Sequence, residues 1–496
     1  MKLVNHFIGG KVYDAAPERT GRVFDPAAGE VSSEVAFATP QIVDEAVRDA
    51  RRAYESWCET PLGKRARIMF TFRDLVDGRR RELAEILVSE NGKVLSDAMG
   101  EVTRGLEVVE FACGIPHLLK GELSENVSSN VDAYSIRQPL GVAAGISPFN
   151  FPAMVPMWMY PLAIACGNTF VLKPSERVPS AANWMAQLFL EAGLPEGVFN
   201  VVHGDKVAVD ALLSHPEIAA VSSVGSTPVA RYIYETAAKK GKRVQALGGA
   251  KNHMVVLPDA EMDLAADAAV SAAYGSSGQR CMAVSAVITV GDAGDALIEK
   301  VRERISSLKV GPGLDEEAEM GPVVTGQAKE RVLSYIDKGI DEGADLVVDG
   351  RGLQVDGHEN GFFVGPCLFD NVTTDMTIYR DEIFGPVLVV VRAETFRDAI
   401  DMVNRNPYGN GASIFTDDGG AAREFQHEAQ AGMVGINVPI PVPMAYYSFG
   451  GWKDSLFGDS HMHGVEGVRF YTRLKAVTSR WPDPEKRGVD LGFPSG

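Results

Sequence analysis

The sequence predicts an α/β protein with two parallel sheets, each flanked by helices. From Gly141 onwards, short apolar stretches alternate with amphipathic helices, which is the pattern of strand–helix–strand units. A second series of the same kind begins near His253. At 496 residues the chain is long enough for two or three domains. The first series contains five expected strands, at 142–146, 169–172, 198–202, 219–224 and 243–247, with helices that begin near Ala181, Lys206 and Ser226.

The segment before Gly141 is expected to be mostly helical. Short strand-like pieces come first, and an amphipathic helix follows with Val43, Ala46, Val47 and Ala50 on one face. More helix is expected over 65–90 and again around 102–113. Residues 131–139 form a polar, extended ribbon, which predicts an arm that leaves the body of the protein.

The second series holds a helix at 262–273 and an apolar strand at 284–290. Further helices are expected at 296–308, 328–342 and 395–404, and further strands at 346–348, 387–391 and 434–437. Near the end of the chain, 467–472 has a strand-like composition. We expect this piece to pair with the ribbon at 131–139.

Composition and charge exclude several classes of protein. The net charge of −18 argues against nucleic-acid binding, which needs basic patches. The most apolar stretch, 152–166, is interrupted by prolines and too short to span a bilayer, so no membrane association is expected. Five widely spaced cysteines without a CxxC motif, and a polar N-terminus without a signal peptide, predict a reduced, cytoplasmic protein.

The stretch Gly275-Ser276-Ser277-Gly278-Gln279-Arg280-Cys281 places one cysteine among small residues, between the expected helix and strand. Such a junction can expose a thiol in a cleft while it holds the backbone on both sides. We expect the adjacent Arg280 to favour the thiolate, which is the nucleophilic form. A simpler interpretation is that Cys281 is a small buried apolar residue.

Several turns at expected strand ends carry polar groups, and ligands of open α/β sheets bind at such ends. Asn150 lies between two prolines, where a rigid amide could donate to an oxyanion. Lys173 and Glu176 follow a strand and could meet a ribose, or could form a surface ion pair. Ser226 opens a helix whose free N–H groups suit a phosphate, or it could simply cap that helix. Glu382 offers another carboxylate before a strand.

In this order and spacing, and together with Gly-Gln-Arg-Cys, these motifs closely resemble the aldehyde dehydrogenase superfamily over nearly the whole chain. The resemblance implies that Cys281 is the nucleophile and that Asn150, with the Cys281 N–H, forms the oxyanion hole. It implies NAD as cofactor, and Glu176 suits NAD better than NADP because a 2′-phosphate would be repelled. The implied cofactor contacts are Phe149, Lys173, Glu176, Gly225, Ser226, Leu247, Glu382 and Phe384.

The resemblance also implies an aldehyde dehydrogenase fold with three parts. A Rossmann-like NAD-binding domain would comprise 1–120 and 140–247, although the GxGxxG fingerprint is absent. An α/β catalytic domain would comprise 248–440. A β-arm at 121–139 and 464–482 would serve oligomerisation, and the family's arm exchange implies a homotetramer, a dimer of dimers.

One position departs from the pattern of hydrolytic family members. They carry a glutamate directly before Leu-Gly-Gly, which activates the water that cleaves the acyl-enzyme, whereas this chain has Ala246 there. Water without a general base is a poor nucleophile, but a thiol attacks thioesters well near neutral pH. The sequence therefore predicts that coenzyme A takes the acyl group.

Several longer stretches are similar to the CoA-acylating methylmalonate-semialdehyde dehydrogenases. They are 101–107, 249–253, 278–283, 448–455 and 467–472. In that subfamily the arginines that match Arg104 and Arg280 hold the substrate carboxylate, and a guanidinium suits that task. Arg104 taken alone would more simply be a charge on a helix surface. No metal is expected, because His461-Met462-His463 lacks a third ligand.

These resemblances imply a small anionic substrate, methylmalonate or malonate semialdehyde. Its oxidation through a Cys281 thioester, with loss of carbon dioxide, would give propionyl-CoA or acetyl-CoA. The valine, inositol and other organic-acid routes stay open as its context. Two alternatives remain: a hydrolytic aldehyde dehydrogenase with a substitute base such as Glu382, and a non-catalytic NAD-binding homologue.

Overall fold

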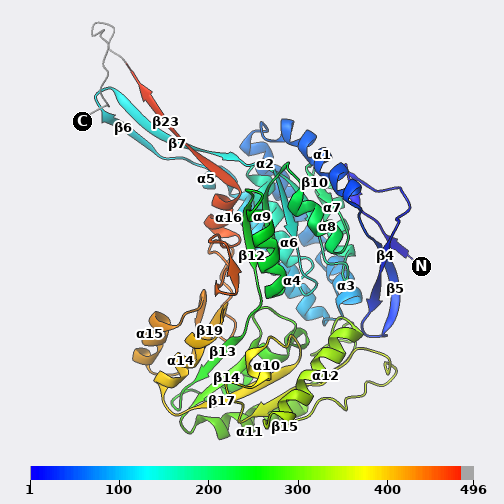
Figure 1. Ribbon diagram of the computed structural model, residues 1–496, viewed down its shortest axis with the longest axis vertical. Coiled ribbons are helices and arrows are strands. Elements are labelled where there is room, and N and C mark those ends of the chain that lie inside the picture. The colour runs from blue at the N-terminus through cyan, green and yellow to red at the C-terminus, as the bar shows by residue number, and fades with distance from the viewer. Residues whose placement is uncertain (1, 482–496) are drawn as a thin grey trace.

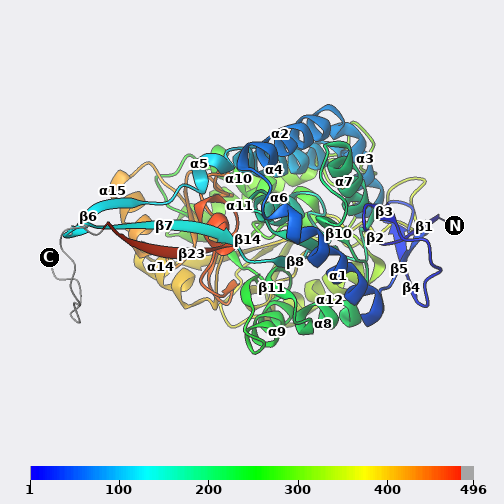
Figure 2. The ribbon, with the colours of Figure 1, turned by 90° about the horizontal axis from the view of Figure 1, so that it is seen from above.

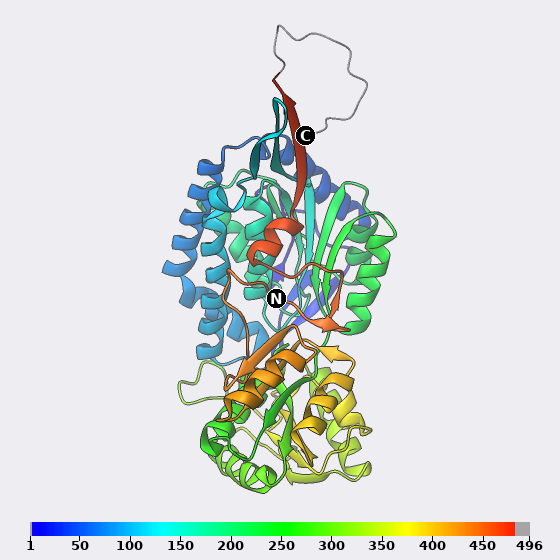
Figure 3. The same cartoon turned by 90° about the vertical axis from the view of Figure 1, so that its left-hand side faces the viewer.

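The computed structural model describes residues 2–481, which form two α/β lobes and a protruding arm (Figure 1). The lobes are stacked along the long axis, and the arm extends from the first lobe away from the second (Figure 3). Residue 1 of the expected first domain and residue 482 of the expected arm lie outside the described residues. None of the helices within 2–481 has the length and apolar character that a membrane span requires.

The first lobe is organised around an eight-stranded sheet in the order β22-β12-β11-β8-β9-β10-β2-β3. Its five central strands are parallel and match the first expected series to within two residues. Short antiparallel strands close both edges. The strands are β8 (Val142–Ile146), β9 (Thr169–Lys173), β10 (Phe199–Val201), β11 (Ile218–Val224), β12 (Arg243–Leu247), β2 (Phe7–Ile8), β3 (Lys11–Val12) and β22 (Leu456–Phe457).

Helices cover both faces of this sheet, as its buried strands require. Along β8, Val142, Ala144 and Ile146 join the core under α1, α8 and α9, whereas Ala143 joins the core on the opposite face. Figure 2 shows α2, α3 and α4 on one side and α8 and α9 on the other. The helices are α1 (Pro40–Trp57), α2 (Leu62–Gly78), α3 (Arg80–Asn91), α4 (Leu95–Cys113), α5 (Ile115–Leu118), α6 (Met154–Ala165), α7 (Ser180–Glu191), α8 (Lys206–Ser214) and α9 (Thr227–Ala238).

Local sequence explains how the N-terminal helices begin and end. Thr39 caps α1 by accepting from the Ile42 N–H, and Pro40 occupies the first turn, where it removes no helical hydrogen bond. The helix expected over 65–90 is in fact two, because the chain departs from helical geometry at Arg79, directly after Gly78. A separate small sheet joins β1 (Lys2–Val4), β4 (Thr20–Asp25) and β5 (Glu30–Ala36).

The second lobe contains a seven-stranded sheet in the order β15-β16-β17-β14-β13-β19-β20, parallel except for the edge strand β15. Its strands are β13 (Asn252–Val256), β14 (Val284–Val290), β15 (Asp345–Val348), β16 (Cys367–Asp370), β17 (Val387–Ala393), β19 (Gly411–Phe415) and β20 (Met433–Ile436). Its helices are α10 (Met262–Tyr274), α11 (Ala293–Ser307), α12 (Gly326–Asp341), α13 (Thr377–Arg380), α14 (Phe396–Arg405) and α15 (Gly419–Glu428). A separate two-stranded antiparallel sheet is formed by β18 (Tyr408–Gly409) and β21 (Trp452–Lys453).

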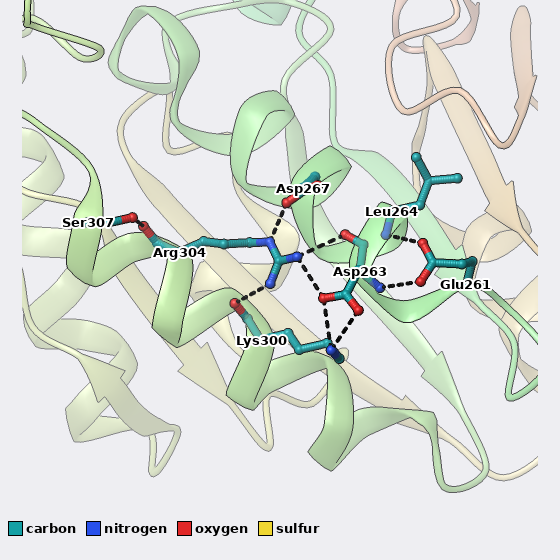
Figure 4. A network of polar contacts seen from close by, with 7 residues as sticks. All are labelled: Glu261, Asp263, Leu264, Asp267, Lys300, Arg304 and Ser307. Carbon is teal, nitrogen blue, oxygen red and sulfur yellow. Dashed lines mark hydrogen bonds and ion pairs between the residues drawn. The ribbon is translucent and has the colours of Figure 1, made fainter.

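Helix α10 leads directly to the cysteine loop and is tied to α11 by ion pairs on its outer side (Figure 4). Asp263 accepts from Lys300 at 2.8 Å and from Arg304 at 2.9 Å, and Asp267 also pairs with Arg304. Glu261 caps the start of α10 by accepting two backbone N–H groups. The first half of the helix that leads to the cysteine loop is therefore held to α11.

The arm is a three-stranded antiparallel sheet in the order β23-β7-β6. Its strands are β6 (Leu123–Ser128), β7 (Val131–Pro139) and β23 (Thr472–Arg480), and β7 confirms the ribbon expected at 131–139. The register of β7 and β23 runs from Thr472 opposite Pro139 to Arg480 opposite Val131.

The strand expected at 467–472 is wrong, because Gly464–Phe470 forms helix α16 and the pairing strand starts only at Thr472. Gly464, Gly467, Val468 and Tyr471 are buried at the spacing of one helix face, and Phe470 is buried beside them. Arg243 also holds the end of this helix by donating to the carbonyls of Arg469 and Phe470.

Candidate active site

The cysteine expected to be the nucleophile lies in a loop between α10 and β14, as the sequence predicts. The loop begins with a 3-10 turn, Gly275–Gly278, in which Ser276 and Ser277 have positive φ values of 49° and 53°. Such conformations are costly for residues with a side chain and persist only where the surroundings enforce them. Here the Ser276 N–H donates to Asp97, and the Ser277 hydroxyl donates to the Gly321 carbonyl at 2.5 Å.

Two asparagines fix the carbonyl group of Cys281. Asn252 donates to this oxygen at 2.9 Å and Asn410 donates to it at 3.1 Å. Both are buried: Asn252 is the first residue of β13, and Asn410 directly precedes the neighbouring strand β19. Sequence reasoning missed both, and the only signal available was a polar residue at the start of an otherwise apolar strand.

The environment of Cys281 opposes ionisation. Burial, and after it the Glu382 carboxylate, raise the pKa of this thiol to about 12. The backbone N–H groups of Cys281 and Met282 lower the pKa, and Arg280 lowers it least. Arg280 thus favours the thiolate, as expected, but its effect is smaller than the opposing effects of burial and of Glu382.

We expect alkylation of Cys281 by iodoacetamide to be slow at neutral pH and to accelerate steadily as the pH rises. Only the thiolate reacts, and a raised pKa lowers the thiolate fraction at any given pH. The change Glu382→Gln should accelerate the reaction, because it removes a charge that raises the thiol pKa. The rate is measured by mass spectrometry of the Cys281 peptide. A rate constant that does not change between pH 6 and 8 would contradict a raised pKa of the Cys281 thiol.

The turn that carries Asn150 is held by a fully buried ion pair. Lys93 and Glu101 are 2.7 Å apart, and both side chains are nearly inaccessible to solvent. Lys93 also donates to the Asn150 carbonyl at 2.7 Å, and Glu101 accepts from the N–H groups of Ala153 and Met154. The Asn150 amide group makes no hydrogen bond within residues 2–481, so it is available to a ligand.

Of the two arginines expected to clamp a carboxylate, Arg280 contacts one face of α4 and Arg104 belongs to that face. Arg280 pairs with Asp97 through its Nη2 atom, and Arg104 lies seven residues beyond Asp97 on the same helix. Seven residues are about two helical turns, or roughly 10 Å, and they return to the same face. Arg104 pairs with Glu107 at 2.8 Å and donates to the carbonyls of Val442 and Pro443.

The residues expected to bind a dinucleotide come together at one edge of the first sheet. In the register of the parallel strands, Ile146 lies beside Lys173 and Ser223, and Val224 lies beside Leu247. The carboxyl ends of β8, β9, β11 and β12 are therefore level. Lys173 and Leu247 are the last residues of β9 and β12, and the turns that begin at this edge contain Phe149, Glu176, Gly225 and Ser226.

Several features of this edge fit a dinucleotide. Ser226 precedes α9 without a side-chain hydrogen bond to the helix, so the N–H groups of Thr227 and Val229 stay open to a phosphate, whereas Pro228 between them has none. Lys173 donates to the Gly204 carbonyl and lies 3.4 Å from the Glu176 carboxylate. Glu176 remains partly exposed, as a group that accepts ribose hydroxyls must be.

Glu382 and Phe384 reach this edge from the second lobe. Glu382 accepts from the Ala250 N–H at 2.9 Å, and the Phe384 ring meets the Phe149 ring edge-on with 5.7 Å between centroids. Glu382 and Phe384 also line one hollow together with Arg280 and Cys281. The described residues that line this hollow all belong to the second lobe, and the first lobe reaches it through the contact of Phe149 with Phe384.

A sequence model described as the aldehyde dehydrogenase family matches residues 13–477. This chain belongs to the aldehyde dehydrogenase family. The solved structures of family members superpose on nearly all of it, which confirms the predicted fold class.

Relatives within the aldehyde dehydrogenase family are similar over their full length. Malonate-semialdehyde dehydrogenase of Pseudomonas aeruginosa is 55% identical over 497 residues, which covers 100% of both chains. Malonate-semialdehyde dehydrogenase 2 of Geobacillus kaustophilus is 50% identical over 481 residues, covering 97% of this chain and 99% of the relative.

Two solved structures are equally similar. Methylmalonate-semialdehyde dehydrogenase of Oceanimonas doudoroffii has a TM-score of 0.96 and 55% identity, and the match covers 98% of this chain and 99% of that one. A protein of Sinorhizobium meliloti 1021, crystallised with NAD, has a TM-score of 0.96 and 54% identity, covering 97% of this chain and 99% of the other.

Proposed function

We propose that this aldehyde dehydrogenase oxidises malonate or methylmalonate semialdehyde with NAD and transfers the acyl group to coenzyme A. The observation that carries the proposal is the position of Arg280. It is the direct neighbour of Cys281, lines the same hollow, and is held against the α4 face that also presents Arg104. A substrate that carries both an aldehyde and a carboxylate fits this pairing of a thiol with guanidinium groups. Half or more of the residues are shared with malonate-semialdehyde dehydrogenases, which supports the same substrate class.

In this proposal Cys281 attacks the aldehyde carbon while the arginines orient the carboxylate. The Asn150 amide and the Cys281 N–H stabilise the resulting alkoxide. Bound NAD supplies a hydride acceptor, and the product on the protein is a Cys281 thioester. The thioester carbonyl lies β to the carboxylate, so it can receive the electrons released when carbon dioxide leaves.

Ala246 supports release of the product by a thiol. Its side chain is fully buried in β12, where it packs into the core under α9 and pairs with Phe457. This position therefore offers no general base to a water molecule. Coenzyme A, as a thiol, can attack the Cys281 thioester directly, which leaves Cys281 free and gives propionyl-CoA or acetyl-CoA.

A hydrolytic reaction is the second candidate, and Glu382 is the observation that favours it. Among the described residues that line the hollow with Cys281, Glu382 alone carries a carboxylate. Burial raises its pKa, although the Ala250 N–H and Lys251 lower it. A carboxyl group with a raised pKa is a better proton acceptor in its ionised form.

The two candidates are separated by measuring NADH formation from methylmalonate semialdehyde with and without coenzyme A. We expect sustained turnover only with coenzyme A and propionyl-CoA as the product, identified by mass spectrometry. Without coenzyme A we expect at most one NADH per subunit, because the thioester then persists. Steady turnover to a free acid without coenzyme A would instead establish the hydrolytic reaction.

The proposal also covers the role of the arm and the limits of the two domains. We infer that the arm, expected at 121–139 and 464–482, mediates homo-oligomerisation through its three strands rather than through α16, since Ile136 and Leu474 expose apolar side chains on those strands. The proposed NAD-binding domain comprises 1–120 and 140–247, and the proposed catalytic domain comprises 248–440. Light scattering on the intact protein tests for a tetramer.

A further inference from the structure

One face of α4 contacts three separate loops of the candidate site. Asp97, Glu101 and Arg104 follow one another at spacings of four and three residues, which places them on the same side of the helix. Asp97 contacts the cysteine loop, Glu101 contacts the turn after Asn150, and Arg104 contacts the segment at Val442. Glu101 holds the Asn150 turn and Arg104 belongs to the proposed clamp, whereas Asp97 has no assigned role in the proposed reaction.

Asp97 binds the cysteine loop at two points. One carboxylate oxygen accepts both the N–H and the hydroxyl group of Ser276, each at 2.9 Å. The other oxygen accepts from Nη2 of Arg280 at 2.5 Å. Asp97 thus joins the residue with positive φ to the arginine that lies beside the nucleophile.

These contacts use only one edge of the Arg280 guanidinium. Its Nε donates to the Ser276 hydroxyl at 3.4 Å and its Nη2 donates to Asp97, whereas Nη1 has no hydrogen-bond partner within residues 2–481. The group also lies against Gly275, where an added Cβ would be only 2.4 Å from the guanidinium carbon. The guanidinium is therefore held in one orientation, and its Nη1–Nη2 end is left for a ligand.

We propose that Asp97 is a positioning residue that sets the selectivity for acidic aldehydes. By holding the Nε–Nη2 edge of Arg280, it directs the Nη1–Nη2 end toward the substrate carboxylate. The partly buried pair, with 20% exposure of each side chain, keeps this orientation without a substrate. This inference rests on the proposed clamp, in which Arg280 binds the substrate carboxylate.

The change Asp97→Asn tests the inference, because asparagine can still accept from Ser276 but presents an N–H group to Arg280. We expect kcat/KM for methylmalonate semialdehyde to fall by about 10-fold or more, mainly through KM, since a misdirected guanidinium loses a charge-assisted bond. The value for propanal, which has no carboxylate, should change by less than about 3-fold. Asp97→Glu keeps a carboxylate and should restore part of the selectivity.

The ratio of the two kcat/KM values does not depend on the fraction of folded protein, so it remains informative if a variant is unstable. Asp267→Asn, which removes an ion pair on the outer side of α10, is the matched control and should leave the ratio unchanged. Equal losses on both substrates in Asp97→Asn, or an unchanged ratio, would overturn the inference. Arg280→Leu is measured alongside, and if it spares the ratio, the clamp itself is wrong and the proposed function fails separately.

Discussion

Replacement of Cys281 by alanine should abolish NADH formation from both acidic and neutral aldehydes. In the proposed reaction every turnover passes through a thiohemiacetal and a thioester at this sulfur, and no other cysteine lines the hollow among the described residues. The loop would keep its shape, because its contacts involve the Cys281 carbonyl, Ser276 and Ser277 rather than the thiol. NADH absorbance measures the loss, and unchanged circular dichroism shows that the fold is intact.

Cys367→Ala is the matched control, since Cys367 lies in β16 of the same lobe and does not line the hollow. It should retain activity.

Asn150→Ala should have a smaller effect than Cys281→Ala. Losing one oxyanion donor should lower kcat by about 10²–10³-fold. Substantial turnover by Cys281→Ala would show that the hydride leaves a hydrate rather than a covalent adduct, and would contradict covalent catalysis.

Lys93→Met should be the most destabilising single change near the site. It leaves the Glu101 carboxylate buried without its cation, and breaking such a pair typically costs about 3–5 kcal/mol of the free energy of unfolding. It also removes the hydrogen bond to the Asn150 carbonyl, so kcat should fall even in the fraction that remains folded. Urea unfolding and kinetics with propanal measure the two effects separately.

The double change Lys93→Met with Glu101→Gln should recover most of the stability. Glutamine is neutral and so leaves no unpaired buried charge, and its carbonyl can still accept from the N–H groups of Ala153 and Met154. The recovery should not extend to kcat, because the contact with the Asn150 carbonyl is still missing. Lys309→Met breaks an exposed pair with Glu317 and should leave the unfolding midpoint unchanged. If Lys93→Met were as mild as this control, the buried pair would not hold the turn.

Periodicity alone predicted much of the fold. The strands from Val142 to Leu247 and helix α10 are continuous in sequence and carry their own apolar pattern, so they were placed to within two residues. The strand prediction for α16 was wrong, because over so short a length Val468, Phe470 and Tyr471 fit both the alternation of a strand and the 3.6-residue period of a helix. Contacts decided the outcome: Gly467 packs closely on Leu162, and Arg243 binds the last carbonyls of the helix.

Site residues that belong to one local sequence motif could be predicted. Contacts between segments that are distant in the sequence could not. Cys281 lies in a recognisable loop, and the structure places it in one hollow with Glu382 and Phe384. The net pKa of its thiol could not be predicted, because it depends on burial and on Glu382 more than on the adjacent Arg280. Arg280 itself pairs with Asp97, 183 residues earlier, and no local pattern indicates that partner.

One face of α4 holds three loops of the candidate site, and this restricts how the protein can be redesigned. The cysteine loop, the Asn150 turn and the segment at Val442 come from distant parts of the chain, yet all three bind this one helix. A loop transplanted from a relative with another substrate would meet side chains matched to the original loop. New substrate ranges should therefore be sought by exchanging α4 together with its loops, as one module.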